Sequence, residues 1–189
     1  MRLTPRRLLL VATVVAVGAG AAVVLGMTPV ERPAFIDRIE YPLDYGDIVR
    51  AHAAENRLDS ALVAAVIYEE SRFRPRATSK VGAMGLMQIQ PVTGETIARR
   101  TGGTSFRVDD LYDPEINVRY GSWYLRKLID KYGDERLALA AYNAGETTVD
   151  GWLHDGKGIA AASVQAYVDG VESTKKVYRH AYGSDLPRN

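Results

Sequence analysis

The feature that most limits the fold of this chain is a succession of helical patterns from Asp47 onward, each with its own start and stop signals. Aspartates stand before apolar stretches as N-caps, proline occupies first turns, and glycines follow the last periodic residues. We find no strand-like alternation of apolar and polar residues and no internal repeat. The pattern predicts an all-α domain, with helices over 46–55, 59–73, 91–100, 114–132, 135–143, 148–153 and 163–182.

The N-terminus differs from the rest of the chain. Met1 to Arg7 is short and basic, and Leu8 to Leu25 is an uncharged apolar run with Thr13 as its only polar side chain. A run of this length spans most of a bilayer core, and basic residues before it favour a cytoplasmic N-terminus. We expect residues 1–27 to be a membrane anchor, with a signal sequence cleaved near Ala19-Gly20-Ala21 as the alternative. Both interpretations place the remainder in the cell envelope, outside the cytoplasmic membrane.

Three prolines, Pro29, Pro33 and Pro42, fall between this run and the first helix of the domain. Proline removes a helical hydrogen bond and suits extended chain. We therefore expect an extended linker over 28–45, which would hold the domain off the membrane. The domain is expected over 46–183, with a short tail over 184–189.

Composition narrows the chemistry. The chain has no cysteine, which excludes disulfides, thiolate nucleophiles and zinc–thiolate sites. Its three histidines are scattered without ligand-like spacing, so we expect neither a metal nor another cofactor. The formal net charge is +1, of which Arg2, Arg6 and Arg7 contribute +3, so residues 28–189 carry −2. This balance gives no electrostatic reason to expect nucleic acid as a partner.

A carboxylate stands on the apolar face of the helix predicted over 59–73. At 100° per residue from Val66, the centre of that face lies at about +30° and Glu70 at about +40°. Glu69 lies at about −60°, at the edge of the face, where it reaches water. Burial raises the pKa of a carboxyl group, as a general acid near neutral pH requires. The alternative is a structural glutamate paired with one of the arginines at 72, 74 and 76.

Three motifs follow in order along the predicted helices. Glu70-Ser71 ends a helix, Gly85-Leu86-Met87-Gln88 lies in a glycine-punctuated loop, and Ala141-Tyr142-Asn143-Ala144-Gly145 ends a later helix. Together with Leu111 to Asn117, they resemble the soluble lytic transglycosylases, which share the lysozyme-like fold with goose-type lysozymes. The similarity runs from about Tyr41 to Tyr182. It implies a lysozyme-like all-α domain that acts on the glycan strands of peptidoglycan.

The resemblance implies that one carboxylate does the work that most glycosidases divide between two. Glu70 would protonate the oxygen between N-acetylmuramic acid and N-acetylglucosamine. It would then accept a proton from the muramoyl C6 hydroxyl as that oxygen attacks C1. The product would be a 1,6-anhydromuramoyl end, and water would not enter the bond. The alternatives are a lysozyme-type hydrolase and a non-catalytic module that binds peptidoglycan.

The resemblance also implies substrate contacts. Ser71 would lie near the reacting oxygen, Met87 and Gln88 would line the muramoyl subsite, and Tyr142 would orient Glu70. Asn143 would contact an acetamido group or a peptide. Each of these residues also has a structural interpretation: a helix terminator for Ser71, core packing for Met87 and Tyr142, and a helix C-cap for Asn143.

One segment departs from the family pattern. Many relatives open the last helix with Glu-Thr-Arg, whereas this chain has Ser163-Val164-Gln165-Ala166 before Tyr167. Tyr167 is expected to keep its place as a wall of the groove. We expect the contacts that this Glu or Arg makes in those relatives to be absent here, which would alter affinity or the preference for chain ends.

Overall fold

The computed structural model describes residues 33–186. The predicted anchor over 1–27, the first part of the linker and the last residues of the tail lie outside the described residues. The part that is described is all-α, with α2 (Ala34–Glu40), α3 (Gly46–Glu55), α4 (Ser60–Ser71), α5 (Pro91–Thr101), the 3₁₀ helix η1 (Val108–Tyr112), α6 (Pro114–Tyr132), α7 (Glu135–Ala144), α8 (Glu146–His154) and α9 (Ala162–Tyr182). Between residues 33 and 186, no helix is both long and apolar enough to cross a bilayer.

The predicted helix starts are confirmed by side-chain caps. Asp59 accepts a hydrogen bond from the backbone of Ala61 at the start of α4, and Asp134 caps α7 in the same way. Asp113 accepts from two backbone N–H groups of α6, whose first residue is Pro114. These caps satisfy N–H groups that have no partner within the helix, which is why local sequence located these starts so well.

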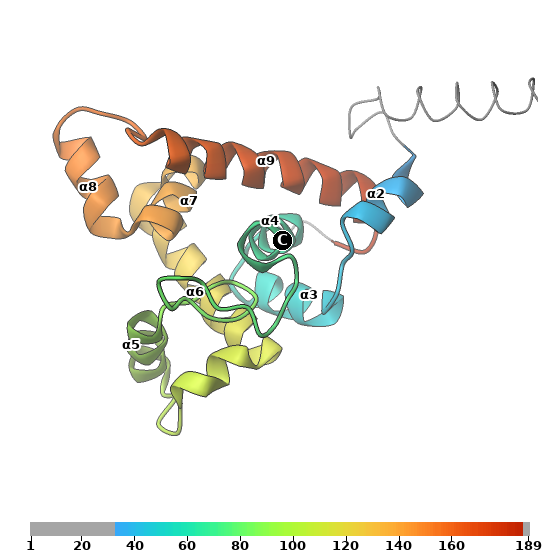
Figure 1. Cartoon of the computed structure of the whole chain (residues 1–189), viewed down its shortest axis with the longest axis horizontal. Coiled ribbons are helices and arrows are strands. Elements are labelled where there is room, and N and C mark those ends of the chain that lie inside the picture. The colour runs from blue at the N-terminus through green and yellow to red at the C-terminus, as the bar shows by residue number, and fades with distance from the viewer. Residues whose placement is uncertain (1–32, 187–189) are drawn as a thin grey trace, which may run out of the picture.

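Helix α4 lies at the centre of the domain, with α9 running along one side of it and α3 on another (Figure 1). Every residue from Ser60 to Ile67 is buried, so the first two turns of α4 are covered all round rather than on one face. A helix that is apolar on all sides requires such a position. Burial decreases only in the last turn, at Tyr68, Glu69 and Glu70, where α4 reaches the edge of the core.

The extended conformation predicted for the linker is wrong for α2. This helix packs on the C-terminal part of α9: Arg38 Nε donates to the Ala181 carbonyl (2.8 Å), and buried Asp37 lies 3.0 Å from Nδ1 of His180. The prolines flank the helix and do not interrupt it, since Pro33 is its N-cap. Tertiary contacts with α9 therefore stabilise a helix that is too short to be stable on its own.

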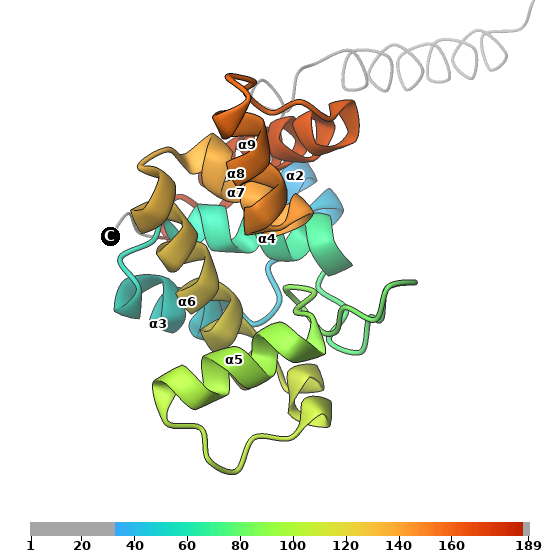
Figure 2. The same ribbon diagram turned by 90° about the vertical axis from the view of Figure 1, so that its left-hand side faces the viewer.

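The remaining helices form the other side of the domain. Figure 2 shows α5 beside α6, at the end of the molecule away from α9. The aromatic and apolar side chains of α6 face this core: Tyr120 and Leu128 are buried, while Trp123 and Tyr124 are half-buried. Helix α7 lies between α6 and α9, and α8 packs against α7.

Candidate active site

The catalytic candidate lies in the last turn of α4, where the chain turns sharply. Arg72 and Phe73 both adopt left-handed backbone conformations, with φ of 52° and 57°, although neither is glycine. Such residues need support from their surroundings. Buried Phe73 supplies it by packing against the ring of Tyr178, 6.1 Å away. This turn therefore ends α4 at a fixed position, so that its last turn, which carries Glu70, lies at the edge of the core.

Glu70 is partly buried and is held from the facing helix. The hydroxyl of Tyr167 on α9 donates a hydrogen bond to Glu70 Oε1 at 2.7 Å. Burial raises the pKa of Glu70 to about 7, the Tyr167 hydrogen bond opposes this rise, and the negative charge of Glu69 adds to it. A carboxyl group with this pKa is both a usable acid and a usable base near neutral pH.

The adjacent glutamate has a different environment. Glu69 Oε1 accepts a hydrogen bond from Thr174 at 2.6 Å and lies 3.5 Å from Arg72 NH1, so it faces α9 and solvent. The structural interpretation of Glu70 as an arginine-paired glutamate is wrong, because no lysine or arginine of residues 33–186 pairs with it. Arg74 donates instead to the Ser71 carbonyl. The two glutamates are inequivalent, as the helical positions predict.

The loop carrying Met87 and Gln88 is fixed by a buried asparagine of α6. Asn117 Nδ2 donates to the carbonyls of Met84 (2.9 Å) and Leu111 (2.7 Å), and its Oδ1 accepts from the Met87 N–H at 2.7 Å. Gly85, at φ +80°, passes so close that a Cβ there would lie 2.1 Å from the Leu111 carbonyl oxygen. The glycine is therefore required for this approach, beyond its turn conformation.

Two of the predicted substrate contacts are buried in the structure. Ser71 is 1% exposed, and its hydroxyl donates to the Leu86 carbonyl at 2.7 Å, which ties the loop to α4. Met87 is 0% exposed and packs where Gly121 of α6 leaves room: a Cβ on Gly121 would lie 2.3 Å from Met87 Sδ. Neither side chain faces the surface, so the expectation that Met87 lines a sugar subsite is not supported. Both residues position the loop.

Gln88, Tyr142 and Asn143 come together around one cavity of about 270 Å³, which we call the site cavity. Gln88 adopts a left-handed conformation (φ 48°), and its Nε2 donates to the Gly85 carbonyl at 2.9 Å. Within the described chain its Oε1 has no hydrogen-bond partner, so that oxygen is available to accept a bond from a ligand. Asn143 is exposed at the rim.

The roles expected of the two tyrosines are exchanged. The hydroxyl of Tyr142 donates to the Met87 carbonyl (2.8 Å), whereas Tyr167 donates to Glu70. Tyr142 is nevertheless close enough to Glu70 for the charge of that carboxylate to act on it: burial and this charge both raise the pKa of Tyr142 well above 10. The pKa of Tyr167 is raised for the same two reasons. Both phenols therefore remain protonated donors at physiological pH.

The altered segment before Tyr167 does not disturb this arrangement. Val164 is buried in the core, and Gln165 Nε2 donates along the helix to Asp169 Oδ1 at 3.3 Å.

In the part of the chain that is described, no group of three or more His, Asp or Glu side chains is arranged to hold a metal ion.

Residues 47–180 match the family model described as "Transglycosylase SLT domain". The chain belongs to this family. The match covers the segment from α3 to α9, including Glu70, the site cavity and Tyr167.

Several relatives resemble this SLT domain. It is 31% identical over 155 residues to the soluble lytic murein transglycosylase of Salmonella typhimurium, covering 76% of this chain and 24% of that protein. It is 36% identical over 124 residues to membrane-bound lytic murein transglycosylase F of Yersinia enterocolitica, covering 61% and 23%. A transglycosylase of Enterobacteria phage PRD1 is 41% identical over 103 residues, covering 54% and 36%. The chain thus spans roughly a quarter to a third of the length of these relatives.

Solved structures agree with the fold. The 70 kDa soluble lytic transglycosylase of Escherichia coli superposes with a TM-score of 0.72 at 28% identity, covering 80% of this chain and 27% of that one. An inactive variant of lytic transglycosylase Slt from Pseudomonas aeruginosa, in which one glutamate is replaced by glutamine, gives 0.71 at 29% identity, covering 80% and 26%. The lysozyme-like all-α architecture expected from the motifs is confirmed.

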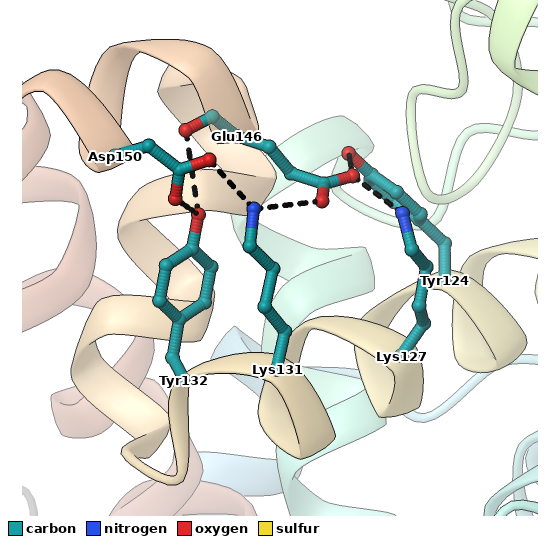
Figure 3. A network of polar contacts seen from close by, with 6 residues as sticks. All are labelled: Tyr124, Lys127, Lys131, Tyr132, Glu146 and Asp150. Carbon is teal, nitrogen blue, oxygen red and sulfur yellow. Dashed lines mark hydrogen bonds and ion pairs between the residues drawn. The ribbon is translucent and has the colours of Figure 1, made fainter.

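The SLT domain also contains a polar network that sequence reasoning missed. Figure 3 shows four side chains of α6 directed toward Glu146 and Asp150 of α8. Lys127 and Lys131 lie 2.6 Å and 3.1 Å from the carboxylate of Glu146. Tyr124, whose ring lies 5.7 Å from that of Tyr142, donates to the same carboxylate at 3.4 Å. The network ties the start of α8, next to Asn143, to α6.

This network is charged at neutral pH. Although burial opposes it, the hydrogen bonds from Lys127 and Lys131 leave the pKa of Glu146 below its usual value. Burial and the charge of Glu146 raise the pKa of Tyr124 to about 12, so this phenol stays protonated. The signal in the sequence was the spacing of Lys127 and Lys131 one turn apart on α6, but their partner on α8 is set by the packing of the helices.

Proposed function

We propose that this chain is a peptidoglycan lytic transglycosylase that cleaves the β-1,4 bond between N-acetylmuramic acid and N-acetylglucosamine, with Glu70 as its single acid and base. The observation that carries the proposal is the environment of Glu70: a partly buried carboxyl group with a pKa raised to about 7, held by Tyr167 and close to Tyr142, which lines the site cavity. Its support from comparison is the match of the SLT family model and the lytic murein transglycosylases among the relatives.

In the proposed reaction, protonated Glu70 gives its proton to the glycosidic oxygen as the bond from muramoyl C1 breaks. The N-acetylglucosamine end leaves with a hydroxyl group, and positive charge develops at C1 and the ring oxygen. The muramoyl C6 oxygen then bonds to C1, and its proton returns to Glu70. The products are a 1,6-anhydromuramoyl end and a regenerated acid, without water being consumed. Because the attacking hydroxyl belongs to the substrate, this step has the advantage of an intramolecular reaction.

The surroundings of Glu70 fit both halves of this cycle. Burial favours the protonated form that begins it, and the Tyr167 hydrogen bond stabilises the carboxylate that forms in the middle. Glu69 is the one carboxylate of the described residues whose charge acts on Glu70, and it is held on the other side by Thr174 and Arg72. A one-carboxylate mechanism therefore suits this site better than a two-carboxylate one. We propose substrate contacts for Gln88, Asn143 and Tyr167, and positioning roles for Ser71, Met87 and Tyr142.

The test is digestion of purified sacculi followed by mass spectrometry of the released muropeptides. Anhydro ends are expected from the wild-type chain, and Glu70→Gln should release none while still binding sacculi. The matched control is Glu69→Gln, which should remain active. Reducing ends would assign the chain to the lysozyme-type hydrolases, and binding without cleavage by the wild type would assign it to the non-catalytic modules.

We further propose that the domain over 46–183 works in the cell envelope, held at the cytoplasmic membrane by residues 1–27. The support is the basic leader and apolar run of the sequence and the lytic murein transglycosylases among the relatives, some of which are named membrane-bound. Immunoblotting a C-terminally tagged chain distinguishes the two forms of the proposal: the full-length product is expected for an anchor, and a product shorter by about two dozen residues would indicate a cleaved signal sequence.

A further inference from the structure

A second cavity of about 180 Å³ adjoins the site cavity, and we call it the side cavity. The two cavities share Thr93 of α5 and Tyr124 of α6 as lining residues, so they meet at this pair. From there the side cavity extends between α5 and α6, lined also by Arg100, Trp123 and Lys127. A ligand that occupies the site cavity beside Gln88 and Asn143 therefore has a neighbouring space into which a branch can extend.

The side cavity has an excess of positive charge. Its one acidic residue is Glu146, whose carboxylate is already within 2.6 Å of Lys127 and 3.1 Å of Lys131 (Figure 3). The positive charge of Lys127 is therefore balanced by the Glu146 carboxylate. Arg100 is exposed, and no residue from 33 to 186 forms an ion pair or hydrogen bond with its guanidinium. Its neighbour Arg99, in contrast, lies 4.0 Å from Glu95 and is not part of the cavity lining.

The positive charge of Arg100 indicates which part of the proposed substrate fits the side cavity. The sugars of a peptidoglycan strand present hydroxyl and acetamido groups, whereas the charged groups lie on the stem peptides that branch from the muramoyl units. A guanidinium binds a carboxylate through two parallel hydrogen bonds, which a sugar hydroxyl does not offer. Half-buried Trp123 adds an apolar surface for a small side chain such as alanine. The lining thus matches an anionic peptide better than further sugar.

We infer that the side cavity binds the stem peptide of the muramoyl unit in the site cavity, with Arg100 holding a peptide carboxylate. This inference rests on the proposed function, because it concerns the same substrate. It makes Arg100 a determinant of specificity: the residue distinguishes strands that carry peptides from strands that do not. It predicts that the wild-type chain prefers peptide-bearing strands.

The experiment compares two substrates and three proteins. The substrates are glycan strands with intact stem peptides and the same strands stripped of peptide by an amidase, with the lactyl carboxylates that the amidase leaves then converted to amides. The proteins are the wild type, Arg100→Ala and the matched control Arg99→Ala on the next residue of α5. Loss of a charge-assisted hydrogen-bonded contact should lower kcat/KM for peptide-bearing strands by about tenfold, mainly through KM. Stripped strands should be cleaved by all three proteins at the same rate.

Three results overturn the inference: Arg100→Ala has no effect, it slows both substrates equally, or Arg99→Ala has the same effect as Arg100→Ala. Thermal unfolding of the variants should match the wild type, since both arginines are exposed on α5. If the wild type cleaves neither substrate, the proposed function fails instead. The inference is then decided by calorimetric binding of a disaccharide-peptide fragment and its peptide-free disaccharide to the wild type and Arg100→Ala.

Discussion

Replacing Glu70 by glutamine should stabilise the folded domain, and the gain should depend on pH. Its pKa is raised from the ordinary 4.5 to about 7 because burial penalises the charged form. Ionising Glu70 therefore costs more in the folded than in the unfolded chain. Between the two pKa values the folded state binds more protons, so stability falls as pH rises through this window. Glutamine fills the same space without a charge and avoids this loss.

The size of the effect follows from the shift. A difference of roughly 2.5 pKa units at about 1.4 kcal/mol per unit corresponds to about 3 kcal/mol once Glu70 is fully ionised in both states. The gain should be close to zero near pH 4, about 2 kcal/mol at pH 6 and about 3 kcal/mol at pH 8. For a domain of this size, about 3 kcal/mol corresponds to a rise in Tm of roughly 6–12 °C.

Urea unfolding followed by circular dichroism at pH 4, 6 and 8 measures this gain directly. Glu69→Gln is the control, because it also removes one carboxylate from the last turn of α4. Glu69 accepts a hydrogen bond from Thr174 and pairs with Arg72, so its replacement should not stabilise the fold by a comparable amount. A gain for Glu70→Gln that is the same at all three pH values would refute the reasoning, as would destabilisation at pH 8.

Two further substitutions test the site. Tyr167→Phe removes the hydrogen bond that lowers the pKa of Glu70, so the alkaline limb of the pH profile of kcat/KM should move upward by about one pH unit. Tyr142→Phe is the control, because the Tyr142 hydroxyl donates to a backbone carbonyl, and its alkaline limb should stay in place. A downward shift in Tyr167→Phe would contradict this. Gly85→Ala should destabilise the domain by about 3 kcal/mol in thermal unfolding, because the new Cβ would lie 2.1 Å from the Leu111 carbonyl oxygen. Gly82→Ala is the control: Gly82 has a similar φ of +82° but no atom within 4 Å of a Cβ, so this variant should lose only about 1 kcal/mol of stability.

The helices of this domain were predictable because their ends are specified locally. Asp59, Asp113 and Asp134 each stand before a helix and cap it, and Gly133 ends α6 in a left-handed conformation. Helix α2 was missed because its seven residues are too few to form a stable helix on their own and prolines stand on both sides of them. Its stability comes from packing on α9, through contacts such as that of Arg38 with Ala181, 143 positions later in the sequence.

The sequence was sufficient to predict which residues form the site, but not which contacts they make with one another. The position of Glu70 on α4 followed from helical periodicity, whereas the identity of its hydrogen-bond donor depends on how α9 crosses α4, which no local pattern gives. The burial of Met87 likewise depends on the gap that Gly121 leaves on α6. A motif shows which residues belong together, and packing decides which of them contact a ligand and which support the others.

The same packing links the stability of the domain to its chemistry. Burial at the end of α4 pushes Glu70 toward its neutral form, and Tyr167 on α9 pulls it back toward the carboxylate. The resulting pKa near 7 is a balance between two effects that both depend on how α4 packs on α9. A site placed on only one of these helices would lack one side of the balance. The acid therefore has its useful pKa only in the folded domain, and it reduces the stability of that fold when ionised.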